Sequence, residues 1–170
     1  MIHARTLWLP LLLLLLLPSG CGFQLRGALT LPPELSPMQI QGLPAHDPLR
    51  PLLERLLQAA GVTLSDTPQS AQSTLRITAR DRQRQVLSVD QRGRAAEYAL
   101  FEGVRFTLQQ RDGERWGNEQ ALVVERSLLN LQEQLLGTQD QEELLREEMR
   151  RDLVGRMVRT LATLTTLTAP

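Results

Sequence analysis

The chain has 170 residues, and its 19 basic residues, all of them arginine, balance 19 carboxylates to give a net charge of zero. This balance argues against a nucleic-acid partner, because proteins that bind phosphate backbones carry a clear excess of positive charge. Two histidines and one cysteine are too few for a zinc site, and no nucleotide-binding glycine loop is present. We therefore expect no metal, no cofactor and no catalytic residues.

The N-terminal segment has the pattern of a lipoprotein signal peptide. After a short basic head, an apolar run extends from Leu7 to Leu17, and Ser19-Gly20 supplies the small residues that a signal peptidase needs. The run is shorter than the roughly 20 residues that span a bilayer. Cys21 follows at once, so we expect residues 1–20 to be removed and Cys21 to carry the lipid. The alternative is an ordinary secretory signal followed by an incidental cysteine.

Residues 21–37 are rich in proline, which favours an extended, lipidated tether ahead of a single domain at 38–165. The domain opens with a short strand at 38–41. A helix is predicted next, because Asp47 is a good N-cap and Gly61 favours a helix end. Between them, leucines at helical spacing predict one apolar face: Leu49, Leu52, Leu53, Leu56 and Leu57.

Three strands are expected next, at 74–89, 95–110 and about 122–128. Turn residues separate them, at Asp90–Arg94 and at Asp112-Gly113. Strict alternation along the first strand would place four arginines on its polar face: Arg76, Arg80, Arg82 and Arg84. The apolar alternation fades at 81–85, where a bulge would change the face that later residues occupy.

A long helix completes the domain. Thr138 and Gln141 have the spacing of a capping box, and apolar residues then recur at helical spacing: Leu145, Met149, Leu153, Met157, Leu161 and Leu164. Residues 166–170 are expected to form a frayed tail. The order of elements predicts an α+β fold, a two-layer sandwich of a mainly antiparallel four-stranded sheet with two helices packed on one face.

Three motifs resemble those of LptE, the lipopolysaccharide-assembly lipoprotein family of Gram-negative outer membranes. They are Cys21-Gly22-Phe23-Gln24-Leu25-Arg26-Gly27, then Gly93-x-x-Ala96-Glu97-Tyr98, and Glu147-Glu148-Met149. The motifs occur in the family's order, and the resemblance covers the whole chain after the signal peptide.

The resemblance implies a non-catalytic lipoprotein held by its lipid in the inner leaflet of the outer membrane, on the periplasmic side. Members of the family plug the LptD β-barrel in a 1:1 complex, help it to assemble, and bind lipopolysaccharide during its export to the cell surface. Gly22 fits this location, because aspartate after the lipidated cysteine commonly signals retention in the inner membrane.

Lipopolysaccharide carries phosphate groups, and arginine binds phosphate through paired, charge-assisted hydrogen bonds. The candidates for this contact are Arg92 and Arg94 in the turn, with Arg80, Arg82 and Arg84 behind them. The alternative is that these arginines only pair across the sheet with Glu97, Glu102 or Glu125.

Two aromatic residues are candidates for contact with the barrel. Phe101 falls on the polar face of its strand, and Trp116 lies near the second hairpin. Exposed aromatic side chains often anchor interfaces. They are equally compatible with isolated surface hydrophobic residues, which carry no function.

Two other functions are considered. A free-standing periplasmic lipoprotein that binds or carries a lipid should enclose an apolar pocket between sheet and helices. A small enzyme would have to draw its titratable groups from His46 and Tyr98, the only histidine and tyrosine after the signal peptide.

Overall fold

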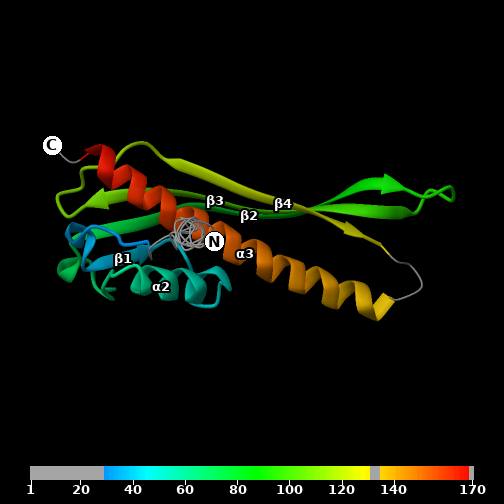
Figure 1. Cartoon of the computed structure of the whole chain (residues 1–170), viewed down its shortest axis with the longest axis horizontal. Coiled ribbons are helices and arrows are strands. Elements are labelled where there is room, and N and C mark those ends of the chain that lie inside the picture. The colour runs from blue at the N-terminus through cyan, green and yellow to red at the C-terminus, as the bar shows by residue number, and fades with distance from the viewer. Residues whose placement is uncertain (1–28, 131–134, 169–170) are drawn as a thin grey trace, which may run out of the picture.

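The computed structural model describes residues 29–130 and 135–168 (Figure 1). The elements in chain order are η1 (Pro33–Leu35), β1 (Met38–Gln41), α2 (Leu49–Ala59), η2 (Pro68–Ser70), β2 (Ser73–Val89), β3 (Ala95–Gln110), β4 (Gln120–Leu129) and α3 (Leu135–Thr168). This α+β arrangement of a four-stranded sheet and two helices confirms the predicted fold class. Cys21 and the signal peptide lie outside the described residues.

The sheet has the order β1-β2-β3-β4 and is mixed rather than purely antiparallel. β2 pairs with β3, and β3 with β4, in antiparallel fashion. A short turn joins the first pair and a longer loop joins the second, and antiparallel strands need no crossover. β1 instead runs parallel to β2, with Met38 opposite Ser73 and Gln41 opposite Arg76. The chain returns from β1 to β2 through α2, the crossover that a parallel pair requires.

The core lies between the sheet and the helices. On α2, Leu49, Leu53 and Leu57 are fully buried, whereas Leu56 is exposed at the edge of the predicted stripe. The stripe of α3 is confirmed by four fully buried residues: Met149, Leu153, Met157 and Leu161. They meet a row of buried sheet residues that includes Leu75, Leu100, Phe106 and Leu108.

Two local structures fix the start of α2 and the path of the chain before it. The Asp47 carboxylate accepts the backbone N–H of Leu49, the first residue of α2, at 2.8 Å, although the N-cap position falls on Pro48, one residue after the predicted Asp47. Gly42 has a φ of +75°, and a Cβ atom at this position would lie 2.1 Å from the carbonyl oxygen of Ile77. Only glycine therefore allows the chain to leave β1 so close to β2.

The ends of the domain differ from expectation. Residues 29–37, part of the expected tether, pack on the domain: Leu31 and Leu35 are buried, and Ser73 Oγ donates to the Leu35 carbonyl at 2.5 Å. The capping box at Thr138 is wrong as a helix start, because α3 begins earlier, at Leu135. The helix also continues through 166–168, residues that the sequence predicts to fray.

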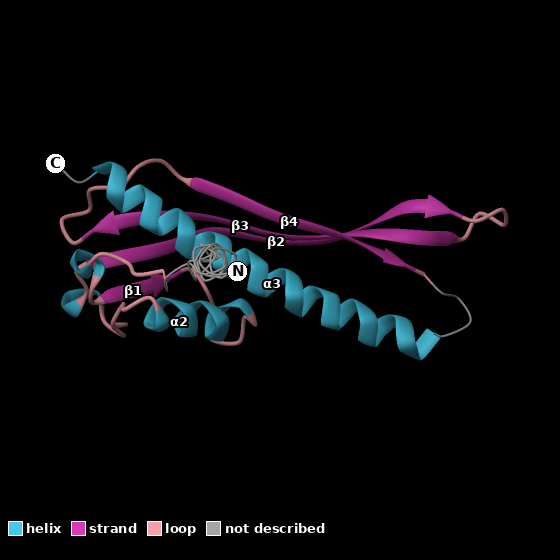
Figure 2. Ribbon diagram, in the orientation of Figure 1, coloured by secondary structure: helices cyan, strands magenta, loops and turns pink. Residues whose placement is uncertain are grey.

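β2 and β3 reach well beyond α2 (Figure 1). Figure 2 shows both strands as long continuous ribbons that extend past the cover of α2. We call residues 81–103, on β2, β3 and the turn between them, the arm, and residues 90–94 its tip. Every β2 residue from Asp81 to Val89 is exposed, so this part of the strand belongs to the surface rather than to the core.

Candidate functional site

An irregularity in β2 decides where its arginines lie. The pairing of β2 with β3 shifts between Ile77 and Ala79, which places one extra residue in β2. Leu75 and Ile77 face the helices before the shift, and Arg80, Arg82 and Arg84 face them after it, opposite Val104, Glu102 and Leu100. The prediction that Arg76 shares a face with these three arginines is therefore wrong. The shift leaves Arg76 on the sheet face turned away from the helices, which we call the outer face.

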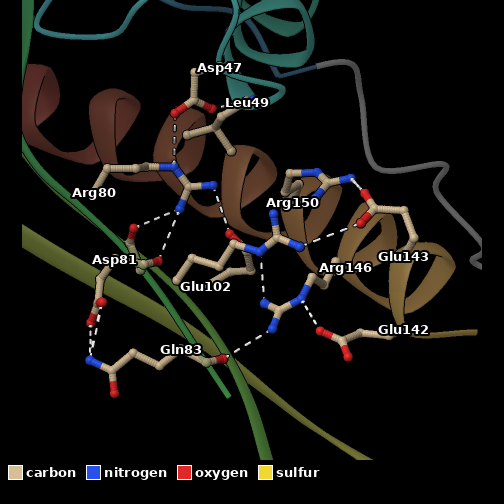
Figure 3. Close-up of polar contacts among 12 residues, drawn as sticks. Asp47, Leu49, Arg80, Asp81, Gln83, Glu102, Glu142, Glu143, Arg146 and Arg150 are labelled. Carbon is tan, nitrogen blue, oxygen red and sulfur yellow. Dashed lines mark hydrogen bonds and ion pairs between the residues drawn. The ribbon is translucent and has the colours of Figure 1, made fainter. Parts of the chain in front are cut away.

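Glu102 is the centre of a buried ion-pair cluster at the base of the arm (Figure 3). Its side chain has no exposed surface, and its Oε2 lies 2.7 Å from Arg80 Nη2. Its Oε1 lies 3.2 Å from Arg146 Nη1 on α3 and 3.8 Å from Arg82 Nε. Strand and helix arginines thus converge on one buried carboxylate, which compensates the cost of removing its charge from water.

Arg80 and Arg146 join this carboxylate to the surrounding backbone and helices. Arg80 Nη1 donates to the Gly103 carbonyl at 2.8 Å, and Arg80 Nε lies 3.7 Å from Asp47 at the start of α2. Arg146 is 2% exposed; its Nε donates to Glu142 at 2.8 Å and its Nη2 to the Gln83 carbonyl at 3.3 Å. The cluster therefore ties both helices to the strands at the point where the arm leaves the core.

A second tier of pairs surrounds the cluster. Arg82 lies 3.5 Å from Glu143 and Arg84 lies 3.1 Å from Glu142, both on α3. Arg84 also stacks over the ring of Tyr98, with its Cζ 3.6 Å from the ring centroid. Together, the cluster and its second tier contain five cations and four anions. The cations are Arg80, Arg82, Arg84, Arg146 and Arg150, and the anions are Asp47, Glu102, Glu142 and Glu143. The cluster is therefore almost neutral.

These contacts favour the paired reading of three of the five candidate arginines. Of the carboxylates proposed as cross-strand partners, Glu102 pairs with Arg80 and Arg82, and the other acidic partners come from α3 and from the loop before α2. Glu143 also accepts a hydrogen bond from Arg150 at 2.8 Å, and this bond holds the pKa of Glu143 below its ordinary value.

The tip is organised differently, around Asp90. Its Oδ1 accepts the backbone N–H groups of Arg92 at 2.8 Å and Arg94 at 2.9 Å, and its Oδ2 accepts the side chain of Arg94 at 2.9 Å. The hydrogen bond from the Arg94 backbone lowers the pKa of Asp90. Arg94 is thereby paired. In the described part of the chain, the guanidinium of Arg92 makes no hydrogen bond or ion pair, and its side chain is exposed.

Apolar side chains are exposed in the part of β2 that leads to this tip. Val86, Leu87 and Val89 are 55%, 55% and 60% exposed within the last four residues of β2, and Val86 and Leu87 point to opposite faces of the strand. The end of the arm thus combines a free guanidinium with apolar surface.

The two barrel-interface candidates lie in different surroundings. Phe101 is half-buried on the outer face, opposite Gln83 on β2 and Glu125 on β4. Trp116 is half-buried in the loop between β3 and β4 and packs against the core. Phe101 shares its face with Val123, which is 56% exposed. The structure does not bring Phe101 and Trp116 onto one element.

The two groups considered for catalysis make no polar contacts in the described residues. His46 is exposed, and within residues 29–130 and 135–168 neither its ring nor the Tyr98 hydroxyl makes a hydrogen bond. The same residues contain no cluster of histidine, cysteine, aspartate and glutamate that could hold a metal ion. Nor does any helix among them have the length and apolar character needed to cross a membrane.

Comparison with known proteins identifies relatives along most of the chain. The family model "LptE: Lipopolysaccharide-assembly" matches residues 35–161. A Photorhabdus laumondii protein named LPS-assembly lipoprotein LptE is 30% identical over 159 residues, which cover 94% of this chain and 86% of that protein. A Yersinia pestis protein of the same name is 29% identical over 171 residues, covering 94% and 76% of the two chains.

Solved structures share the fold. The solution structure of an uncharacterized lipoprotein B from Nitrosomonas europaea matches with a TM-score of 0.70 and 24% identity, over 85% of this chain and 93% of that one. The crystal structure of rare lipoprotein B from Shewanella oneidensis matches with a TM-score of 0.67 and 22% identity, over 77% and 97%. At these identities the likeness concerns the fold alone.

Proposed function

Because the chain belongs to the LptE lipopolysaccharide-assembly family, we propose that it is a non-catalytic outer-membrane lipoprotein that takes part in lipopolysaccharide export. In this proposal a lipid on Cys21 anchors the chain to the periplasmic leaflet. The domain plugs the LptD β-barrel in a 1:1 complex, helps the barrel to assemble, and binds lipopolysaccharide.

The observation that carries the lipopolysaccharide contact is the free guanidinium of Arg92 in a tip that directly follows the exposed apolar residues at the end of β2. Lipopolysaccharide presents phosphates next to acyl chains, so a matching site needs a cation next to apolar surface. Arginine offers two parallel N–H donors to a phosphate, and such charge-assisted bonds are stronger than neutral ones. Arg94 supports the site by holding the turn through Asp90.

The inner arginines have another role in this proposal. Arg80, Arg82 and Arg84 are engaged by carboxylates, and the cluster carries nearly as many anions as cations. A phosphate would have to displace those carboxylates before it could bind. We therefore assign these arginines to fixing the direction of the arm and Arg92 to the ligand.

The outer face supports the plug assignment. It carries Phe101 and Val123 among polar and charged neighbours such as Gln83, Glu125 and Ser127. The lumen of a membrane barrel is polar, so a plug needs a face of mixed character rather than an apolar one. We propose that this face contacts the barrel.

A free-standing lipid carrier is less well supported. It would need an apolar chamber between the sheet and the helices. In the described residues that region is filled by one cluster of buried side chains, with Leu53, Phe106 and Met157 fully buried.

The lipopolysaccharide site is tested by charge reversal at Arg92 in the full-length chain in detergent. We expect Arg92→Glu to weaken binding of purified lipopolysaccharide by about 10- to 100-fold, since hydrogen bonds to charged groups contribute about 1.5–3 kcal/mol. Arg55→Glu is the matched control, because Arg55 is also exposed and without a side-chain partner among the described residues but lies on α2, away from the arm. Equal affinities for the two variants, measured by calorimetry, would contradict the tip site.

A further inference from the structure

A hollow lies at the end of the sheet opposite the tip. It has a volume of about 470 Å³ and is lined by Glu34, Gln72, Gln110, Arg111, Asp112 and Trp116. Gln72 directly precedes β2 and Gln110 ends β3, whereas the tip joins the other ends of these two strands. At about 3.3 Å per residue, the length of β3 separates the two places by roughly 50 Å. The hollow is therefore not part of the site proposed for lipopolysaccharide.

The size of the hollow falls within the range of roughly 300–1,000 Å³ that small-molecule sites occupy. Its lining is unlike that of an apolar ligand site, because five of its six residues are polar or charged. Trp116 is the exception. Its half-buried side chain packs against the core and also lines the hollow, so packing against the core holds the Trp116 side chain in place at this surface.

Most of the polar groups in the lining are available to a ligand. Among the described residues, the side chains of Glu34, Gln72 and Gln110 make no hydrogen bond or ion pair. Arg111 is oriented by its Nη2, which donates to the Gln69 carbonyl at 2.8 Å. Asp112 Oδ1 accepts the backbone N–H of Glu114 at 3.0 Å, which fixes the direction of its carboxylate.

We propose that this hollow binds an uncharged saccharide. A pyranose ring presents C–H groups on its face, which stack on an indole, and hydroxyl groups at its edge, which both donate and accept hydrogen bonds. The amides of Gln72 and Gln110 also donate and accept, the carboxylates accept, and the guanidinium donates. Every polar group in the lining thus has a counterpart at the edge of a sugar ring.

The charges of the lining disfavour an anionic ligand. Two carboxylates face one guanidinium, and that guanidinium already donates to a backbone carbonyl. A phosphorylated ligand would meet net repulsion. An uncharged polar ring avoids this cost and can donate hydrogen bonds to the carboxylates. It could come from a chain of N-acetylated sugars or from a chain of plain hexoses.

The chain contains an internal reporter for this site. Its two tryptophans are Trp8 and Trp116, and Trp8 lies in the signal peptide that we expect to be removed, so Trp116 is the sole indole of the processed lipoprotein. The processed lipoprotein is prepared in a detergent without a sugar headgroup and titrated with N-acetylchitotriose in one arm and maltotriose in the other. The readouts are tryptophan fluorescence and the NMR shift of the single indole N–H.

We expect saturable changes with a dissociation constant of about 1 mM or lower in at least one arm, and the responding arm identifies the type of sugar chain. Gln72→Ala combined with Gln110→Ala should raise that constant at least fivefold. Gln91→Ala, an exposed glutamine at the tip with no side-chain partner among the described residues, should leave it unchanged. The proposal is overturned if neither readout saturates with either trisaccharide, or if the double variant binds as tightly as the control.

Discussion

The buried carboxylate of Glu102 offers the sharpest test of how the arm is held. Glu102→Gln keeps the shape of the side chain and removes its charge. Arg146, which is 2% exposed, then retains only Glu142 as an anionic partner, at 2.8 Å. Arg80 retains Asp47 at 3.7 Å, too far for a hydrogen bond. The variant therefore leaves buried positive charge that is no longer compensated.

The size of the effect follows from that imbalance. Removing one partner of a buried ion pair costs about 3–5 kcal/mol of unfolding free energy, because the remaining charge stays out of water. The amide oxygen of glutamine still accepts one hydrogen bond, so we expect a loss of about 3 kcal/mol. With a urea dependence of about 1–3 kcal/mol per molar, the unfolding midpoint should fall by about 1–3 M.

The assay is urea unfolding of the full-length chain in detergent, followed by circular dichroism. Glu147→Gln is the matched control, because Glu147 also pairs with an arginine, Arg151, but both side chains are well exposed. Exposed pairs contribute about 0–1 kcal/mol, so this control should move the midpoint little. If both variants lose the same small amount, the cluster does not hold the arm as argued.

Two further predictions concern the backbone and the effect of pH. Gly42→Ala should destabilise the fold far more than Gly61→Ala, as measured by thermal unfolding. Both glycines have positive φ, but only at position 42 would the new Cβ meet backbone, 2.1 Å from the Ile77 carbonyl oxygen. Equal losses would show that the close approach of the chain to β2 after β1 relaxes easily. The hydrogen bonds from Arg150 to Glu143 and from Arg156 to Asp152 lower the pKa values of both carboxylates below their ordinary 4.5 and 3.8. The stability that these two carboxylates contribute is therefore complete above their ordinary pKa values and is lost as the pH falls through the lowered ones. The urea midpoint should drop between about pH 5 and pH 3. Asp152→Asn should make the midpoint depend less on pH, and an unchanged dependence would contradict the assignment.

The sequence predicts the elements well because their signals are local. The stripe on α2 and the spacing of Met149, Leu153 and Met157 on α3 identify the buried faces without any knowledge of the partner. The turn at Asp90–Arg94 follows from its own side chains in the same way, since Asp90 bonds the N–H groups of its neighbours. The direction of β1 could not be obtained in this way, because it depends on which edge of the sheet the chain returns to.

The ion-pair cluster shows where local signals end. The fading alternation after Ile77 indicates a possible bulge, but only the pairing with β3 fixes its position and moves Arg80 to the helix face. Glu102 is identifiable as a cross-strand partner because it is polar and lies near the arginines in register. Glu142 and Glu143 are not, since their contacts depend on how α3 crosses the sheet. From the sequence alone, the same acidic residues on α3 are equally compatible with a helix face that only contacts water.

Whether the chain acts as the plug of an outer-membrane barrel can be measured by purifying the tagged full-length chain from detergent-solubilised outer membranes. Native mass spectrometry of the eluate measures the mass and stoichiometry of any complex. We expect one LptD barrel for each copy of the chain. A chain that elutes alone, from membranes shown to contain the barrel, would contradict it.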